Sequence, residues 1–430
     1  MARKEKTRKN GGRDESLLCA IDIGSSEIRA MAATSNPDGT LHILGMESMP
    51  MKAGAVERGL IMQTTDVNYM IRRILLLLGN RIGLRNPIES VFVPLGGKLL
   101  QVRQVSVKRD LISSNYILDK LLVAMHEECR QKIEDRYNTM AVLSAEPLKY
   151  LLDGVEQTYR PTATQKAKFV EVVYNVFVGK ADSRDKVKGS FDRANVSIEK
   201  QWVRPDVLVS ALTDDDDRRD GCAIIDFGAQ TTTMSIYKGD RFLYTRVVPL
   251  GGHDINVNIQ TQRVSFELAE RLKTQFGYAA EDFVEDNRTL RVRSNAAEGG
   301  TVELSVRGLA QMIQMKLNEM LDPLMKDLYE YESEIGHVYI TGGGCKLSGM
   351  CEFVQAMTKL PVEYGSHAIW LEESADDEYF FPENSALIGT LGEAAEYRKN
   401  FPDEEPDTVP PFKKVWEKIG EKTLEIFTDQ

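Results

Sequence analysis

The chain has 430 residues, of which 42% are hydrophobic and 28% are charged, and its formal net charge is −11. This length is enough for two or more domains of roughly 100–200 residues and a large buried core. The acidic balance argues against a nucleic-acid-binding protein, because such proteins usually show a strong basic bias.

The N-terminal segment and the cysteines indicate a reduced, cytoplasmic setting. Residues 1–15 are basic and polar with no apolar stretch behind them, so the sequence predicts a disordered basic tail and no signal peptide. No run of about 18 apolar residues occurs, so we expect no membrane-spanning helix. None of the cysteines forms a C-x-x-C pair, which favours free core thiols over metal ligands. They are Cys19, Cys129, Cys222, Cys345 and Cys351.

Order is expected to begin with a buried strand over residues 17–21 and a second strand over 28–33. The turn sequence Asn36-Pro37-Asp38-Gly39 then predicts a hairpin. From Asp66 to Gly79 the apolar residues recur at helical spacing, which predicts a helix.

The middle of the chain has strands and a helix of its own. Strand patterns occupy residues 88–107 and 168–178, and charged helical sequence occupies 117–136. We therefore expect residues 87–179 to form a small inserted domain.

The opening pattern recurs after an acidic stretch, residues 213–220, which we expect to be a loop. Residues 17–45 and 221–252 each contain an apolar strand, an Asp-x-Gly turn and a hairpin return. Such a diverged internal repeat predicts two related α/β lobes with a cleft between them. Further along, helices are expected over 263–276 and 305–330, with Pro323 kinking or splitting the second. A short strand at 337–340 leads directly into Thr341 and three glycines.

Two glycine turns are candidate phosphate sites. Each follows a strand, and glycine lets the backbone approach a bound group while N–H groups and hydroxyls bind phosphate oxygens. Asp22 and Asp226 could hold a metal-bound water, since Mg²⁺ prefers carboxylate and water ligands. One Asp-x-Gly turn alone is usually only a turn, but repeated turns at strand ends favour binding. The turns are Asp22, Gly24, Ser25 and Ser26, and Asp226, Gly228, Ala229, Gln230, Thr231 and Thr232.

A third turn, Gly342, Gly343 and Gly344, presents a surface without side chains on which a flat ring or ribose could lie. The alternative is a flexible loop.

In this order the three turns resemble the phosphate-1, phosphate-2 and adenosine motifs of the actin/Hsp70/sugar-kinase superfamily. Val248-Pro249-Leu250-Gly251-Gly252 is similar to the return strand and glycine pair of the FtsA family. Ala269-Glu270-Arg271-Leu272-Lys273 is similar to that family's adenosine-contacting helix. The resemblance covers roughly 17–395 and implies that Gly251, Gly252, Glu270 and Lys273 belong to the nucleotide site. For Glu270 and Lys273 the alternative is a surface charge pair at i,i+3 spacing.

The resemblance implies a two-lobed, actin-like ATPase fold of α/β class, with duplicated RNase-H-like halves and an inserted subdomain (1C). The first lobe (1A) is expected at 16–86 and 180–215, the insertion at 87–179 and the second lobe (2A/2B) at 216–395. It also implies bound ATP and Mg²⁺. Family members usually have glycine at position 230 and an acidic residue at 233, where this chain has Gln230 and Thr233. We therefore expect ATP binding with slow or absent hydrolysis.

The C-terminal segment is amphipathic. A Pro-rich acidic linker, residues 396–411, precedes residues 412–428, in which a stripe of seven mostly apolar side chains falls within an arc of about 120° on a helix. Lysines flank this stripe, which favours an interfacial helix in the headgroup layer over a core-packing helix. The stripe consists of Phe412, Val415, Trp416, Ile419, Thr423, Ile426 and Phe427.

Together these features and the resemblance predict an ATP-binding scaffold of cell division. Its expected partners are the FtsZ C-terminal tail, other copies of itself, membrane lipid and later division proteins. Its expected place is the inner face of the membrane at the septum, and no nucleic acid is expected. The alternatives are a chaperone ATPase, a small-molecule kinase of the same fold and an actin-like pilus-assembly protein. The amphipathic segment distinguishes the preferred function from the pilus protein.

Overall fold

The computed structural model describes residues 17–117, 119–137, 139–157, 160–239, 241–295, 300–365 and 369–400, without the side chains of 112–115. The expected basic tail, most of the expected linker and the amphipathic segment 412–428 lie outside the described residues.

The first of two central sheets is built around a buried N-terminal strand. Its strand order is β11-β6-β1-β2-β3, in which β1 is antiparallel to β2 and parallel to β6. Because both faces are covered, successive residues of β1 alternate between two cores: Cys19 and Ile21 lie in one, Leu18 and Ala20 in the other. The strands are β1 (Leu18–Ile23), β2 (Glu27–Ser35), β3 (Leu41–Pro50), β6 (Ser90–Leu95) and β11 (Ser197–Val203).

The second sheet repeats the first strand for strand. Its order is β14-β13-β12-β17-β18, again with two antiparallel hairpin pairs followed by two parallel neighbours. This shared topology confirms the internal repeat and the two-lobed fold expected from the sequence. The strands are β12 (Cys222–Phe227), β13 (Thr232–Lys238), β14 (Arg241–Val248), β17 (His337–Thr341) and β18 (Val362–Tyr364).

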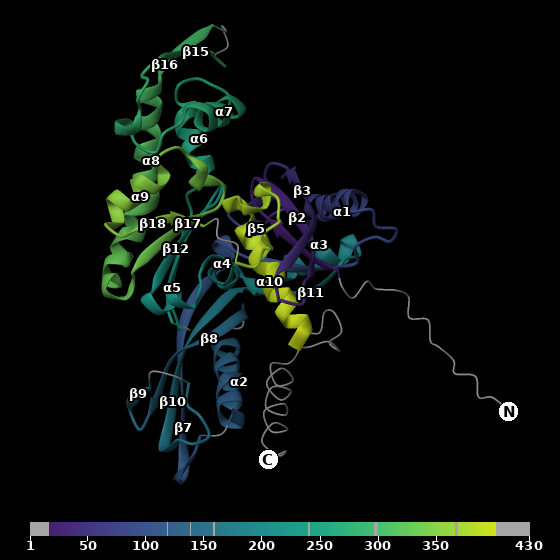
Figure 1. The fold of residues 1–430 in the computed structure, drawn as a ribbon, viewed down its shortest axis with the longest axis vertical. Coiled ribbons are helices and arrows are strands. Elements are labelled where there is room, and N and C mark those ends of the chain that lie inside the picture. The colour runs from purple at the N-terminus through teal and green to yellow at the C-terminus, as the bar shows by residue number, and fades with distance from the viewer. Residues whose placement is uncertain are drawn as a thin grey trace, which may run out of the picture.

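A separate antiparallel sheet projects from one end of the molecule (Figure 1). It has the order β7-β10-β8-β9 and is covered by helix α2, with a core of its own. The elements are β7 (Gln101–Tyr116), α2 (Asp119–Arg136), β8 (Met140–Leu152), β9 (Val155–Gln157) and β10 (Lys166–Lys180). We call Gln101–Lys180 the inserted subdomain.

Helices cover both central sheets. Helices α1 and α3 pack on one face of the first sheet, while α6 and α8 pack on one face of the second. Helix α4 lies on the other face of the second sheet. The helices are α1 (Thr64–Arg81), α3 (Ala181–Ala194), α4 (Arg204–Leu212), α6 (Gly252–Gln260), α7 (Phe266–Phe276), α8 (Val306–Glu330) and α9 (Met350–Thr358). Short strands pair as β4 (Val56–Glu57) with β5 (Leu60–Ile61) and β15 (Thr289–Arg293) with β16 (Thr301–Ser305).

Two expected boundaries differ from the structure. The insertion was expected to begin at residue 87, but β6 is hydrogen-bonded between β1 and β11 and belongs to the first sheet. Helix α10 (Ser385–Asn400), expected with the second lobe, packs on the first sheet through Leu387 and Leu391. The chain thus returns to the first lobe at the C-terminal end of the described fold.

Two helical expectations also need correction. The acidic stretch 213–220, expected to be a loop, contains the short helix α5 (Asp215–Asp220). Asp214 caps it by accepting hydrogen bonds from the backbone N–H groups of Asp216 and Asp217. Pro323, expected to kink or split a helix, does not split it, because α8 runs continuously through this position.

Candidate functional site

A cleft of about 1060 Å³ lies between the two central sheets and is lined by residues of all three glycine turns. Most of the residues predicted for the nucleotide site line it, including Glu270 and Lys273. Of the predicted residues, Thr232 and Gly251 do not line the cleft; they contact the segments that form the second turn and its junction with α6. The lining residues from the turns are Asp22, Gly24, Ser25, Ser26, Asp226, Gly228, Ala229, Gln230, Thr231, Gly342, Gly343 and Gly344.

The first two turns have the same hydrogen-bonded geometry. The Gly24 N–H donates to the Glu27 carbonyl at 2.9 Å, and the Gly228 N–H donates to the Thr231 carbonyl at 2.9 Å. A Cβ at Gly24 or at Gly228 would lie 2.8 Å from that same carbonyl oxygen. A larger residue at either position would therefore displace the neighbouring carbonyl. The internal repeat thus includes the hydrogen bonds within the two turns.

The second turn is held against the N-terminus of α6. The Gly252 N–H donates to the Gly228 carbonyl at 3.1 Å, and the His253 N–H donates to the Ala229 carbonyl at 2.7 Å. A Cβ on Gly251 would lie 2.5 Å from the Gly228 oxygen, so Gly251 is needed for this close approach. The buried Thr232 hydroxyl donates to the Leu250 carbonyl at 3.0 Å and fixes the same junction.

The third turn packs directly on the second. Gly342 has a φ of +83°, and a Cβ there would lie 2.4 Å from Asp226 Oδ1. A Cβ on Gly344 would lie 2.9 Å from that of Phe227, whereas Gly343 has open space around it. Gly342 and Gly344 of this turn therefore pack closely against the second turn.

Glu270 and Lys273 form a pair on α7 that faces the cleft. Lys273 Nζ donates to Glu270 Oε2 at 2.8 Å and to the Gly252 carbonyl at 3.0 Å. Burial lowers the pKa of Lys273, and the charge of Glu270 opposes that effect. Asn256, which sequence reasoning missed, also donates to Glu270. This pair is tied to the second turn, unlike a charge pair on the outer surface.

The side chain of Gln230, a residue of the second turn, reaches the opposite lobe. Its Oε1 accepts a hydrogen bond of 2.8 Å from the backbone N–H of Arg58, which lies between β4 and β5 on the first lobe. Its side chain therefore bridges the cleft.

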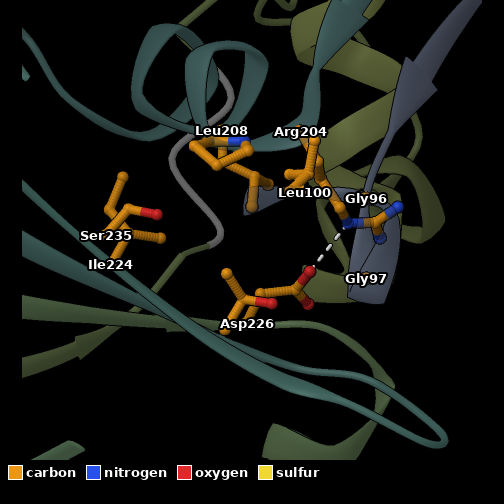
Figure 2. Close-up of a pocket in the computed structure, with 10 residues that line it drawn as sticks. Gly96, Gly97, Leu100, Arg204, Leu208, Ile224, Asp226 and Ser235 are labelled. Carbon is orange, nitrogen blue, oxygen red and sulfur yellow. Dashed lines mark hydrogen bonds and ion pairs between the residues drawn. The ribbon is translucent and has the colours of Figure 1, made fainter. Parts of the chain in front are cut away.

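A second bridge is the main feature that sequence reasoning missed. Arg204, the first residue of α4, donates from Nε to Asp226 Oδ2 at 2.7 Å and from Nη1 to both oxygens of Asp22 at 2.9 Å. Figure 2 shows the guanidinium directed at Asp226, beside Gly96 and Gly97. Burial would lower the pKa of Arg204, but Asp22 and Asp226 outweigh burial and raise it, so the guanidinium stays charged.

These contacts bear on the expected Mg²⁺ site. The carboxylates expected to hold a metal-bound water are both engaged by one guanidinium, and Asp226 Oδ1 is buried with no hydrogen-bond partner among the described residues. A divalent cation between these carboxylates would compete with Arg204 for the oxygens that already accept from its guanidinium. With Arg204 in this position, the residues present do not fit Mg²⁺ directly between the two aspartates. The metal-bound water expected from the sequence stays a prediction.

Among the described residues, no group of three or more His, Cys, Asp or Glu side chains could hold a metal ion. All five cysteines are free, and Cys351 alone among them is not fully buried. No helix in the described ranges is long and apolar enough to cross a bilayer.

Two duplicated sheets flanking a cleft lined with glycine turns define a protein of the actin-like class. Solved structures with this fold include the PilM-PilN type IV pilus biogenesis complex, with a TM-score of 0.64, 18% identity and coverage of 88% of this chain and 98% of that one. MreB5 of Spiroplasma citri bound to ADP has a TM-score of 0.55 and 12% identity, and covers 91% of this chain and 100% of that one.

Within this class the chain is similar to the FtsA family. The family model for cell division protein FtsA matches residues 223–389. The cell division protein FtsA of Bacillus subtilis is 22% identical over 81% of this chain and 78% of its own length. That of Neisseria meningitidis serogroup B is 21% identical over 91% of this chain and 93% of its own. The chain thus has the actin-like fold and is similar to cell division proteins of the FtsA family.

Proposed function

We propose that this protein binds ATP in the cleft between its lobes and acts as a scaffold that tethers the FtsZ ring to the membrane. The observation that supports it best is the convergence of the three glycine turns with Lys273 on one cleft. Backbone N–H groups in such turns bind phosphate oxygens, and the flat third turn suits a base or ribose. The relative from Spiroplasma citri, of the same fold, was solved with ADP bound.

The bound nucleotide favours one closure of the lobes, and copies of the chain assemble into a protofilament at the inner face of the membrane. Gln230 and Arg204 each make a hydrogen bond that links the two lobes across the cleft, and Thr233 stands where the family usually has an acidic residue. We propose that hydrolysis is slow or absent. A phosphate-release assay tests this point, and brisk steady turnover would overturn it.

The membrane contact is assigned to residues 412–428, on their amphipathic sequence pattern. Four lysines and three glutamates accompany its apolar stripe, so attraction to anionic lipid is modest and one copy binds reversibly. Assembly into a filament raises the avidity. The FtsZ C-terminal tail is assigned to the second lobe around 255–335, and this assignment depends on family membership.

Liposome flotation tests the tether. The full chain and a version ending at Pro410 are mixed with vesicles in the presence of ATP, with and without FtsZ. We expect only the full chain to float and to carry FtsZ with it, whereas FtsZ without its C-terminal tail stays behind. If neither version floats, residues 412–428 contact protein, and a pilus-type assembly role replaces the tether.

A further inference from the structure

The cleft contains a positive charge of its own at the point where its two aspartates meet. Arg204 is hydrogen-bonded to Asp22 of the first sheet and Asp226 of the second, at 2.7 to 2.9 Å. The side chains are 21%, 12% and 9% exposed respectively, so the group is largely withdrawn from solvent. One guanidinium therefore bridges carboxylates from both lobes and offsets one of their two negative charges.

The surrounding backbone is shaped to hold this side chain. Arg204 directly follows β11, which is paired with β6, so the position of its Cα is fixed by the first sheet. Gly96 lies against its stem, and a Cβ there would be 2.8 Å from Arg204 Cδ and 3.3 Å from its Cβ. Gly96 thus provides the room that the arginine occupies.

The guanidinium has donors to spare for a ligand. Nε and Nη1 bind the aspartates, while Nη2 makes no hydrogen bond to any described residue. Arginine matches phosphate oxygens in charge and geometry, and its guanidinium does not lose its proton in proteins. The other basic residues that line the cleft are Arg29, Lys273 and Lys346.

We propose that Arg204 takes the place of Mg²⁺ in this cleft, and that the protein binds nucleoside triphosphate in its metal-free form. The guanidinium bridges Asp22 and Asp226 and donates from Nη2 to phosphate oxygens. A divalent cation is disfavoured there because it would compete with Arg204 for carboxylate oxygens that already accept from the guanidinium. This inference depends on the proposed nucleotide binding and adds which form of the nucleotide is bound.

Titration of the full chain with a fluorescent ATP analogue, in Mg²⁺ and in EDTA, tests the proposal. We expect the wild type to bind at least as tightly in EDTA as in Mg²⁺. For Arg204→Gln we expect binding in EDTA to weaken about tenfold or more and Mg²⁺ to restore part of it, since both carboxylates become available. The matched control is Arg291→Gln, which removes an arginine paired with Glu303 on the exposed β15–β16 hairpin and should behave as wild type.

The outcomes separate the two proposals. Wild-type binding that is about tenfold tighter in Mg²⁺ overturns the role of Arg204 and leaves nucleotide binding in place. No binding in either buffer overturns nucleotide binding, and the inference with it. The comparison of wild-type affinity in EDTA and in Mg²⁺ needs no variant. It therefore tests the role of Arg204 even if Arg204→Gln does not fold.

Discussion

At the scale of single residues, the cleft depends on positions where no side chain can be tolerated. Gly342 combines a left-handed φ with contact to Asp226 and Phe227 of the neighbouring strand. Gly343, next to it, has no neighbour within 4 Å of an added Cβ and no left-handed φ. Gly342 is therefore required for the close packing of the turn and Gly343 is not, although the sequence shows only a run of three glycines.

Gly342→Ala is expected to destabilise the fold by about 1–3 kcal/mol, because the new Cβ strains the backbone and meets Asp226 Oδ1. Urea unfolding followed by circular dichroism measures the change. The control is Gly343→Ala, for which a change within about 0.5 kcal/mol is expected. Equal losses in both variants would show that the turn is not held as described.

Lys273→Ala is expected to weaken nucleotide binding about tenfold, because Lys273 is a partly desolvated cation that faces the cleft. Isothermal titration in EDTA and in Mg²⁺ measures this. Lys316→Ala on α8 removes a lysine in the same i,i+3 relation to a glutamate, Glu319, at 2.7 Å. It lies outside the cleft lining and should bind as wild type. Unchanged affinity in Lys273→Ala would remove this residue from the site.

Local sequence predicted the turns but not their neighbours. Asp22 and Asp226 each follow an apolar run and precede a glycine by two residues, and this pattern indicated the two turns. Arg204 and Asn256 have no such pattern: each reaches the cleft from a helix end or face that only the packing of the lobes places there. One signal was available for Arg204, since a glycine pair, Gly96-Gly97, ends the neighbouring strand where its stem must fit.

At the scale of elements, the inserted subdomain is a sheet with one covering helix and its own core. His126 of α2 is buried in that core, and its ring lies edge-on to Tyr174 with centroids 5.4 Å apart. Burial, with a smaller contribution from Arg130, lowers the pKa of His126 to about 4. The core thus holds a neutral imidazole at physiological pH.

This pKa makes the stability of the subdomain sensitive to acid. Between pH 6.5 and about 4 the unfolded chain binds a proton at His126 that the folded chain does not, so the free energy of unfolding falls as pH falls. The His126 contribution to that loss is ~3 kcal/mol at most. His126→Phe is expected to reduce the loss between pH 7.5 and 5, measured by urea unfolding. His42→Gln, at an exposed histidine paired with Glu372, should not reduce it. An undiminished loss in His126→Phe would contradict the assignment.

Periodicity predicted the elements where one pattern dominated. The strands of the repeat and the helix from Asp66 were predicted because apolar residues recur at one clear spacing. Helix α5 was missed because it buries no residue and depends on a capping box. The charged residues of 213–220 suggested a loop, although Asp214 and Asp217 together form the capping box of a helix.

At the scale of the whole molecule, the C-terminal helix of the described fold joins parts that are far apart in sequence. Helix α10 contacts β1 and packs along α4 (Figure 1). Gly389 permits that approach, since a Cβ there would lie 1.9 Å from the Val207 carbonyl. The helix is buried around most of its circumference, so no amphipathic stripe indicated its partner. Its return to the first lobe could not be predicted from spacing for this reason.

The same junction brings three carboxylates together from three parts of the chain. Asp206 of α4 lies near Glu146 of β8 and Glu393 of α10, and Tyr237 of the second sheet donates to Asp206 Oδ1 at 3.5 Å. Burial, followed by the charges of Glu146 and Glu393, raises the pKa of Asp206 well above its usual value. Burial likewise raises the pKa of Glu146. The inserted subdomain, α4 and α10 therefore meet at a point where negative charge is disfavoured.

Asp206→Asn is expected to stabilise the molecule at pH 8 more than at pH 5. An acid whose pKa is raised by folding contributes stability below its unfolded pKa, and that contribution is lost as pH rises through the folded-state pKa. The amide removes this loss and still accepts from Tyr237. Thermal unfolding at both pH values measures the difference in Tm, with Asp216→Asn on the exposed face of α5 as the control that should not change it. A Tm at pH 8 equal to or below that of the wild type would mean that the junction accommodates the ionised carboxylate, and that its three elements are held together by their apolar contacts alone.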